Sequence, residues 1–443
     1  MPSEVAAFLC SVFILTVFAV DFKRKPNVTI SHWIPFIWFL IASSRSVVQW
    51  LYPNEATTMD IASLSSSKID ATVLTILIIL GIVILSRRIK DCNQILINNQ
   101  WLVFMFLYCG ISVIWSDYSL VSLKRWFRGI GTFIMVLVVL TEIDPLETIK
   151  NMFRRCAFLM IPLSILFIKY FRDLGVYYGE FGGAEYVGVT THKNLLGRLC
   201  LILGFYFFWE INERWKNKKK INVTADKIGL FINIIFLVLI FWLLRTANSS
   251  TSTGCLIIAI CILLLLNIPI VKRNINMTIF LLVFILFILS LIIDIENIFV
   301  TSLNREMTFT GRTEVWSICL NLVKNPLIGT GFESFWLGER LKIIWDRYWW
   351  HPIQAHNGYI EVYLELGIVG LFLLSGVMFS IYKSIRKTLV NDFQFGCFQL
   401  SFFVQYLIYN FTESAFGLYS FFWFVFLLIC INQSAEKRTC YSK

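Results

Sequence analysis

The chain has 443 residues, of which 57% are hydrophobic, 16% aromatic and only 15% charged. A soluble domain carries roughly 25% charged residues, because polar side chains must cover its surface. The composition therefore excludes a cytosolic enzyme, a disordered chain and a secreted disulfide scaffold, and it is typical of a polytopic membrane protein. The 11 cysteines include no Cys-x-x-Cys pair, which favours buried thiols over a metal or redox site.

Thirteen apolar segments are long enough, with their flanks, to cross a bilayer, and we expect all of them to be helices because a lipid-exposed backbone must satisfy its own hydrogen bonds. In chain order they are Val5–Val20, Ile30–Leu51, Ala71–Leu85, Trp101–Trp115, Ile130–Leu140, Met152–Phe171, Leu195–Trp209, Ile228–Leu244, Gly254–Ile270, Met277–Val300, Gly367–Tyr382, Phe393–Phe411 and Gly417–Ile431. The fold class is thus an all-α polytopic membrane protein with about 12–13 transmembrane helices.

The net charge of +11 is distributed unevenly over the connecting loops. With the carboxyl tail in the cytoplasm, the inner loops and adjoining span ends hold 23 Lys and Arg against 10 Asp and Glu, and the outer side holds 16 against 18. Because cytoplasmic loops of membrane proteins are enriched in Lys and Arg, this asymmetry supports the orientation. The same enrichment of the inner loops in Lys and Arg accounts for the positive net charge of the protein, so nucleic-acid binding is not needed to explain it.

Two external loops are long, whereas the other external connections are short. One is Lys169–Asn194 and the other is Thr301–Leu366, the only segment that could fold as a small subdomain. We therefore divide the chain into residues 1–300 (membrane helices with the loop 169–194), 301–366 (a large external loop with helical segments) and 367–443 (the last membrane helices and a cytoplasmic tail). Long loops in an otherwise minimal membrane protein are usually functional.

The large loop contains two predicted helices. Apolar spacing predicts a helix over Arg312–Lys324, which Asn325-Pro326 ends, and Gly329 and Gly331 form a turn after it. A second helix is expected to start near His356 and to continue into the span that begins at Gly367. Between them lies a segment dense in Trp and Tyr.

His356 and Arg312 are the strongest candidate functional residues. Histidine is the usual general base or acid near neutral pH, and arginine suits bidentate contact with phosphate oxygens. Each also has an ordinary alternative: an interfacial histidine that makes a plain hydrogen bond, and an arginine in a surface ion pair. His351 is the other histidine of this loop.

Basic residues on the external side form a second group of candidates. Lys124, Arg125 and Arg128 lie at the mouth of a span, and their spacing places Lys124 and Arg128 on one helical face. The segment GVTTHKNLLG places Lys193 at the start of another span. A phosphorylated lipid headgroup would account for external positive charge here, and exposed ion pairs would account for it equally well.

Nucleotide-binding glycine loops, Ser–His–Asp elbows and His/Cys metal spacings are not found. Asp-x-Asp and Glu-x-Asp pairs, which metal–diphosphate sites often use, are also missing from the external loops. A reaction without a metal or other cofactor is the simpler expectation.

Three motifs together resemble the O-antigen ligase-related family, which also includes O-antigen and exopolysaccharide polymerases. They are FTGRTEVW, NPLIGTGFESF and AHNGYIEVYLELGIVG, and the most specific part is the spacing His356-Asn357-x9-Gly367-x2-Gly370. GVTTHKNLLG is similar to a segment of the exopolysaccharide-polymerase branch. The clear resemblance covers about residues 188–200 and 308–372. The family is usually described with 12 spans, which differs by one from our count.

The resemblance implies a GT-C-like, metal-independent, inverting glycosyltransferase of the bacterial inner membrane, with its active site facing the periplasm. The donor would be an oligosaccharide on undecaprenyl diphosphate. The acceptor would be a lipid-linked repeat for a polymerase, which GVTTHKNLLG favours, or the lipid A core for a ligase. A flippase and a chain-length regulator are candidate partners. A transporter of lipid-linked sugars and a receptor or scaffold are the alternatives from other classes.

Two of the family's functional residues map onto this chain by motif. The large-loop histidine corresponds to His356 and a loop arginine to Arg312, which gives the predicted catalytic pair. Without a motif match, the residues expected to hold the diphosphate are Arg125, Arg128 and Lys193. The residues expected to contact the acceptor or its sugars are Asn357, Trp349 and Trp350.

Overall fold

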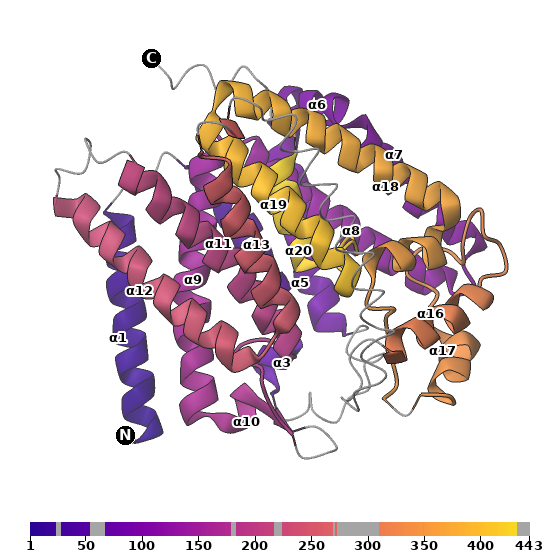
Figure 1. Ribbon diagram of the computed structural model, residues 1–443, viewed down its shortest axis with the longest axis horizontal. Coiled ribbons are helices and arrows are strands. Elements are labelled where there is room, and N and C mark those ends of the chain that lie inside the picture. The colour runs from indigo at the N-terminus through magenta and orange to yellow at the C-terminus, as the bar shows by residue number, and fades with distance from the viewer. Residues whose placement is uncertain are drawn as a thin grey trace. The chain divides into compact units, whose positions relative to one another are not determined.

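The computed structural model describes residues 1–23, 28–53, 67–178, 183–216, 224–268, 271–272, 310–348 and 350–431. Their helices and strands, drawn in Figure 1, are α1 Ser3–Phe22, the 3-10 turn η1 Ile30–His32, α2 Trp33–Ser43, α3 Val47–Leu51, α5 Lys68–Ser86, α6 Ile89–Asn98, α7 Gln100–Ile111, the 3-10 turn η2 Ser112–Trp115, α8 Ser119–Leu140, α9 Pro145–Tyr170, α10 Arg172–Gly175, β1 Val176–Tyr178, β2 Ala184–Tyr186, α11 Lys193–Lys216, α12 Thr224–Ala247, α13 Ser250–Leu265, α16 Thr310–Asn321, α17 Gly338–Trp345, α18 Gly358–Asn391, α19 Phe393–Thr412 and α20 Phe421–Cys430.

The described residues include six helices that are long and apolar enough to span a membrane, namely α1, α5, α9, α11, α12 from Lys227, and α18. A seventh span is possible if α6 and α7 with η2, which meet at 90°, count as one. Helix content and apolarity confirm the all-α polytopic fold. The expected number of 12–13 spans stays a prediction, and the expected span Met277–Val300 lies outside the described residues.

Each of two compact units combines segments from distant parts of the sequence. Unit 1 comprises Met1–Asn98, Arg128–Ile257 and Leu418–Lys443, and unit 2 comprises Asn99–Phe127 and Ile258–Gly417. Helices α8 and α13 each contribute to both. These units follow packing rather than membrane topology, so the predicted division at residues 300 and 366 stays a prediction.

Unit 1 contains a helical bundle whose centre is aromatic. The ring of Phe236 on α12 lies 4.9 Å from that of Phe158 on α9 and 5.8 Å from that of Phe207 on α11, measured between centroids. Phe13 on α1 stacks on the same ring at 5.9 Å. One large apolar side chain thus joins four helices.

Beside these rings, unit 1 buries charged side chains that are paired. Asp21 at the end of α1 accepts hydrogen bonds from Arg154 at 3.1 Å and from Arg155 at 3.0 Å, and all three side chains are at most 3% exposed. Burying a charge away from water is costly unless a partner compensates it. These ion pairs therefore fix the end of α1 against α9.

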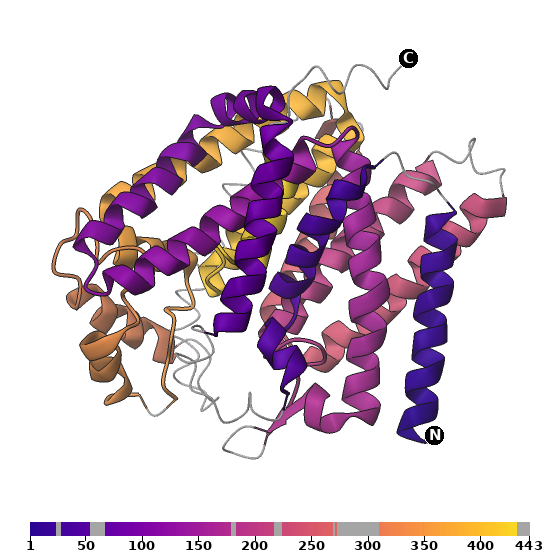
Figure 2. The same cartoon turned by 180° about the vertical axis from the view of Figure 1, so that it is seen from behind.

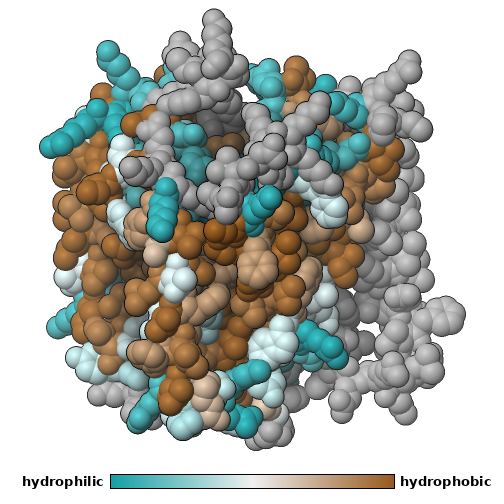
Figure 3. All heavy atoms as spheres, turned by 90° about the vertical axis from the view of Figure 1, so that its left-hand side faces the viewer, coloured by the Kyte–Doolittle hydropathy of each residue, from teal (hydrophilic) through white to brown (hydrophobic). Residues whose placement is uncertain are grey.

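The outer face of α1 and α12 is apolar. Figure 3 shows a hydrophobic band on this side of the protein, bounded by hydrophilic residues at both ends. The exposed apolar side chains include Val5, Phe8, Leu9, Val12 and Leu15 of α1 and Phe231, Val238 and Phe241 of α12. A surface of this kind is expected where helices face lipid.

In unit 2, α18 packs against α7 and α19, and the pair α7–α18 is visible from both sides in Figures 1 and 2. Helix α18 is interrupted at Gly367, whose φ of 65° lies in the left-handed region. The segment that follows α16 supplies the hydrogen bonds that the break removes: the N–H of Ile368 donates to Pro326 O at 3.0 Å, and the N–H of Gly331 donates to Glu365 O at 2.8 Å. The loop is thereby fixed to the helix break.

Gly367 is required at this break for two reasons. A Cβ atom would lie 2.3 Å from Leu327 O, and a positive φ is unfavourable for residues other than glycine. The predicted turn is present as well, since Gly329 and Gly331 have φ of 68° and 95°. The glycine of the His-Asn-x9-Gly motif is therefore a backbone requirement.

Candidate functional site

The described part of the large loop has a hydrophobic core of its own. Helices α16, α17 and the start of α18 bury a shared cluster that consists of Val315, Cys319, Val323, Phe335, Ile344, Ala355 and Leu364. Burial raises the pKa of the Cys319 thiol to about 12, so this cysteine is not a nucleophile near neutral pH. The expected helix over Arg312–Lys324 is present as α16, with bounds Thr310–Asn321.

His356 lies immediately before α18, where the chain turns into the helix. Its φ of 51° lies in the left-handed region, which is unusual for a non-glycine residue. Asn357 caps α18: its Oδ1 accepts from the N–H of Tyr359 at 3.0 Å and of Ile360 at 3.1 Å, and its Nδ2 donates to Phe411 O at 3.3 Å. These contacts use both ends of its amide and fix the start of α18 next to His356. The predicted contact of Asn357 with the acceptor stays a prediction.

Glu413 connects the two predicted catalytic residues. Its Oε2 lies 3.2 Å from His356 Nδ1, and its Oε1 lies 3.8 Å from Arg312 Nη2. Arg312 Nη1 also donates to Thr412 O at 2.7 Å. The structure therefore brings Arg312 and His356 to one carboxylate, although they are 44 positions apart in the sequence.

Glu413 was not among the residues predicted from the sequence. It follows α19 directly, and its side chain is only 4% exposed. A single acidic residue at the external end of a predicted span was the available signal. The sequence did not indicate that this end lies beside the large loop.

The geometry defines which atom of His356 is available for chemistry. A carboxylate accepts hydrogen bonds only, so the proton of the neutral ring is placed on Nδ1, which donates to Glu413. Nε2 then carries the lone pair and can accept a proton from a hydroxyl. Arg312 and His356 together compensate the buried carboxylate.

One of the predicted sugar-contacting rings lies near His356. The ring of Trp350 is 6.4 Å from that of His356, and Tyr348 lies 6.1 Å from Trp350. Trp336 and Trp345 instead donate hydrogen bonds inside the loop, to Glu361 and to Pro352 O. Trp349 lies outside the described residues, so its predicted role stays a prediction.

Arg125 is in unit 2, on the part of α8 that belongs to it. Its Nη1 donates to Glu333 O at 2.6 Å, and its Nε lies 3.8 Å from Glu333 Oε2. Glu333 has a φ of 47°, and its Oε1 lies 3.8 Å from where a Cβ on Gly417 would be. Arg125 is thus paired with Glu333, whose carboxylate lies near Gly417.

Arg128 and Lys193 are found in unit 1. The guanidinium of Arg128 lies over the ring of Tyr419, 4.9 Å from its centroid. The Lys193 ammonium forms an ion pair with Glu185 at 2.6 Å. Their predicted diphosphate contacts stay predictions. Within the described residues, no group of three His, Cys, Asp or Glu is arranged to hold a metal.

Comparison with known proteins identifies a family match in this region. The O-antigen ligase family model matches residues 234–375, a range that contains Arg312, His356 and Gly367. The chain is also 24% identical over 308 residues to the exopolysaccharide production protein ExoQ of Rhizobium meliloti, which covers 66% of each chain. Both findings confirm the resemblance that the motifs indicate.

Shorter matches include proteins of Rickettsia whose names give them as candidate polysaccharide ligases. The protein of Rickettsia prowazekii is 26% identical over 131 residues, which is 28% of this chain and 32% of that one. The protein of Rickettsia conorii is 27% identical over 108 residues, which is 22% and 26% respectively. The chain therefore matches 66% of the length of ExoQ and at most 32% of these two relatives.

Proposed function

Since the chain is related to the O-antigen ligase family through residues 234–375, we propose that it is a membrane glycosyltransferase that moves a lipid-diphosphate-linked glycan onto a sugar hydroxyl. The observation that carries the proposal is the Arg312–Glu413–His356 arrangement. It provides a proton acceptor and a fixed positive charge on one carboxylate. Undecaprenyl diphosphate is the proposed lipid of the donor.

The proposed reaction is a single displacement at the anomeric carbon. The acceptor oxygen forms the new glycosidic bond, the bond from the anomeric carbon to the phosphate oxygen breaks, and the configuration inverts. The hydroxyl proton passes to His356 Nε2, and the electron pair of the broken bond leaves with the lipid diphosphate. Fixing the donor beside the acceptor supplies a large part of the rate enhancement.

Arginines stabilise the leaving diphosphate in this proposal. Arg312 is 24% exposed, and Thr412 O and Glu413 hold its guanidinium in place, so in this proposal a phosphate oxygen approaches it from solvent. Arg125 and Arg128 are the further candidates. Lys193 stays a weaker one, because its ammonium already contacts Glu185.

The acceptor distinguishes two versions of the function. The GVTTHKNLLG segment favours a polymerase that extends a lipid-linked repeat, and the similarity to ExoQ, an exopolysaccharide production protein, is consistent with either version. The family model and the names of the Rickettsia proteins favour a ligase that attaches the glycan to the lipid A core. Either version places the protein in the bacterial inner membrane with the site in the periplasm, and the asymmetry of Lys and Arg supports this orientation. A flippase and a chain-length regulator are the proposed protein partners.

The decisive experiment uses the purified full-length protein in nanodiscs with a purified undecaprenyl-diphosphate repeat. Formation of longer lipid-linked chains from this repeat alone would identify a polymerase. Transfer only after addition of lipid A core would identify a ligase. The same assay in EDTA tests the expected independence of metal ions. If neither product forms and the lipid-linked repeat instead moves between leaflets, a transporter replaces the proposal.

A further inference from the structure

The backbone of Ala355, the residue before His356, is held from two sides. Its N–H donates a hydrogen bond to Oε1 of Glu361, and its carbonyl oxygen accepts one from Trp316 Nε1 at 2.7 Å. Its side chain is buried in the hydrophobic cluster of the loop. Both polar groups of this residue therefore have a partner on α16 or α18.

Glu361 is a buried carboxylate whose hydrogen-bond donors are neutral. It lies in the first turn of α18 and is 7% exposed. Besides Ala355 N–H, it accepts a hydrogen bond from Trp336 Nε1 at 2.8 Å. Burying a carboxylate beside neutral partners is costly, and the N-terminus of a helix compensates only part of that cost. Proteins keep such a cost mainly at functional sites.

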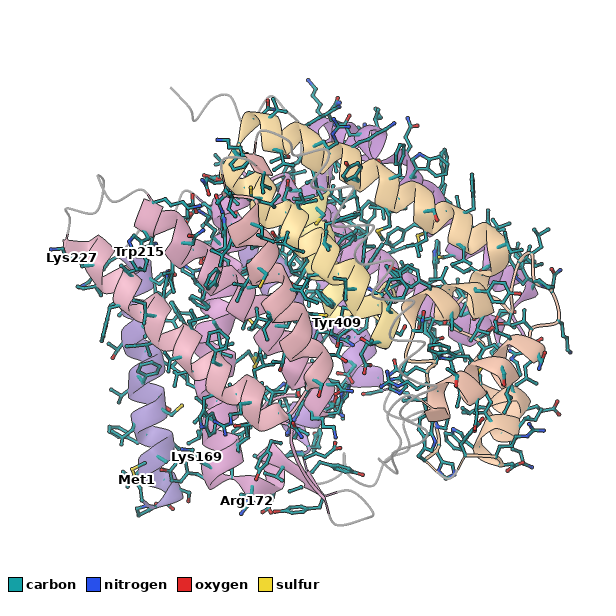
Figure 4. The ribbon with its side chains drawn as sticks, in the orientation of Figure 1. Met1, Lys169, Arg172, Trp215, Lys227 and Tyr409 are labelled. Atoms are coloured by element: carbon teal, nitrogen blue, oxygen red, sulfur yellow. The ribbon has the colours of Figure 1, made fainter. Side chains whose placement is uncertain are left out.

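His356 needs support from its neighbours because its backbone is strained. A φ of 51° is unfavourable for a residue with a Cβ atom, and it persists only where surrounding contacts fix it. Asn357 fixes the chain after His356 as the cap of α18, and the contacts of Ala355 fix the chain before it. Glu413, the partner of the ring, is fixed as well: its N–H donates at 3.0 Å to O of Tyr409, which Figure 4 labels in the last turn of α19.

We propose that Glu361 is a positioning residue for the general base of the reaction. By holding Ala355 N–H, it keeps His356 in the left-handed conformation in which Nδ1 meets Glu413, so that Nε2 remains for the acceptor hydroxyl. The amide Nε2 of Gln354 lies 3.4 Å from the same Nδ1, and Glu413 Oε2 lies at 3.2 Å. When the segment is released, this amide donates to Nδ1 in place of the contact with Glu413, and the ring proton moves to Nε2. The inference rests on the proposed function for the role of His356.

The alternative is that Glu361 serves only the core of the loop. Trp336 packs on Phe335, which belongs to the hydrophobic cluster. A carboxylate that only satisfied the N–H of Trp336 would stabilise the loop and leave the ring of His356 unaffected. The two roles differ in the donor that matters, which is Ala355 N–H for positioning and Trp336 Nε1 for the core. Variants that remove each contact separately therefore distinguish them.

The test reads the protonated nitrogen of His356 directly and without substrate. Full-length protein with ¹⁵N-labelled histidine is reconstituted in liposomes, and magic-angle-spinning NMR at a pH at which the ring is neutral distinguishes a proton on Nδ1 from one on Nε2. The chain has four histidines, and the signals missing from His356→Gln identify this ring. We expect the proton on Nδ1 in the parent and on Nε2 in Glu361→Leu. Glu361→Gln should show both forms, because its single acceptor oxygen serves two donors.

Transfer kinetics provide the second readout. Glu361→Leu should lower kcat about 10²-fold with little change in KM, because a misplaced base slows the chemical step while the glycan contacts remain. Glu361→Gln should lower kcat less than about tenfold. Trp336→Phe removes the other donor to Glu361, and Glu339→Gln changes an exposed glutamate of the same loop. Both controls should keep the proton on Nδ1 and kcat within about threefold of the parent.

Three outcomes would overturn the proposal. The first is a parent ring that carries its proton on Nε2. The second is a proton that stays on Nδ1 in Glu361→Leu or, where that variant does not reach the membrane, in Glu361→Gln. The third is a change in Trp336→Phe as large as that in the Glu361 variants. Absence of transfer by the parent, together with the expected changes in the ring, would instead contradict only the proposed function.

Discussion

Replacing Glu413 by glutamine tests the candidate site most directly. The substitution preserves the size of the side chain and removes its charge. In the protein, this carboxylate is 4% exposed and lies 3.2 Å from His356 Nδ1. An amide at that position can donate to Nδ1, which moves the ring proton to Nε2 and removes the lone pair needed for the acceptor hydroxyl.

The size of the effect follows from the interaction that is lost. A hydrogen bond to a charged group contributes about 1.5–3 kcal/mol, and each 1.36 kcal/mol changes a rate tenfold. During transfer, the ring of His356 takes up the hydroxyl proton and becomes charged, and Glu413 then accepts a hydrogen bond from this charged ring. Loss of that hydrogen bond therefore predicts a fall in kcat of about 10- to 150-fold. The altered tautomer of the His356 ring lowers kcat further. The total fall in kcat is limited to roughly 10⁴-fold, which is the effect of losing a general base.

The assay is initial transfer rate at saturating and limiting donor, for purified variants of equal abundance in nanodiscs. Glu413→Gln should lower kcat with little change in KM, because the carboxylate faces His356 and Arg312 rather than the glycan. Glu413→Asp keeps the charge and should recover part of the rate. A well-expressed Glu413→Gln enzyme within about threefold of wild-type kcat would refute the assigned role of this carboxylate.

Four further predictions concern other parts of the molecule. His356→Ala should reduce the transfer rate about 10²–10⁴-fold. His351→Ala should change the rate little, because the ring of His351 packs on Trp345 and does not contact Glu413. Glycan chain length and turnover are measured for both variants. Arg312→Lys keeps the charge but loses the planar fork that contacts Thr412 O, so kcat should fall more than tenfold in the same assay. Gly367→Ala should destabilise the protein by more than about 1–3 kcal/mol and lower its abundance in the membrane. A cysteine at the exposed position Glu339 should react with a membrane-impermeant reagent added from the periplasm.

The controls for these predictions come from the same chain. Gly254→Ala adds a methyl group where no atom lies within 4 Å, so it should leave abundance unchanged and isolate the backbone effect at Gly367. Equal activity of His351→Ala and His356→Ala at equal abundance would contradict the assignment of the base. Labelling at Glu339 only after the cytoplasm is opened would reverse the orientation.

The sequence alone determined the class of fold and the local structure of the motif region. Hydropathy indicates membrane helices because the bilayer permits few other backbone conformations, and this holds without knowledge of the neighbours of a helix. The helix start near His356 and the turn at Gly329 and Gly331 follow local rules for the same reason. His356 and Arg312 were found as residue types in a recognisable spacing.

Tertiary packing decided how these residues are connected. Glu413 is distant in sequence from Arg312 and His356, and only the contact of the α19 terminus with the loop places its carboxylate on both. The motif alone does not distinguish Asn357 and Gly367 from His356 as candidate functional residues. In the structure, Asn357 caps α18 and Gly367 forms the break in this helix. Arg45 likewise donates long-range hydrogen bonds to Gly188 O and Thr190 O, and such contacts carry no pattern in the sequence because every residue has the same carbonyl group.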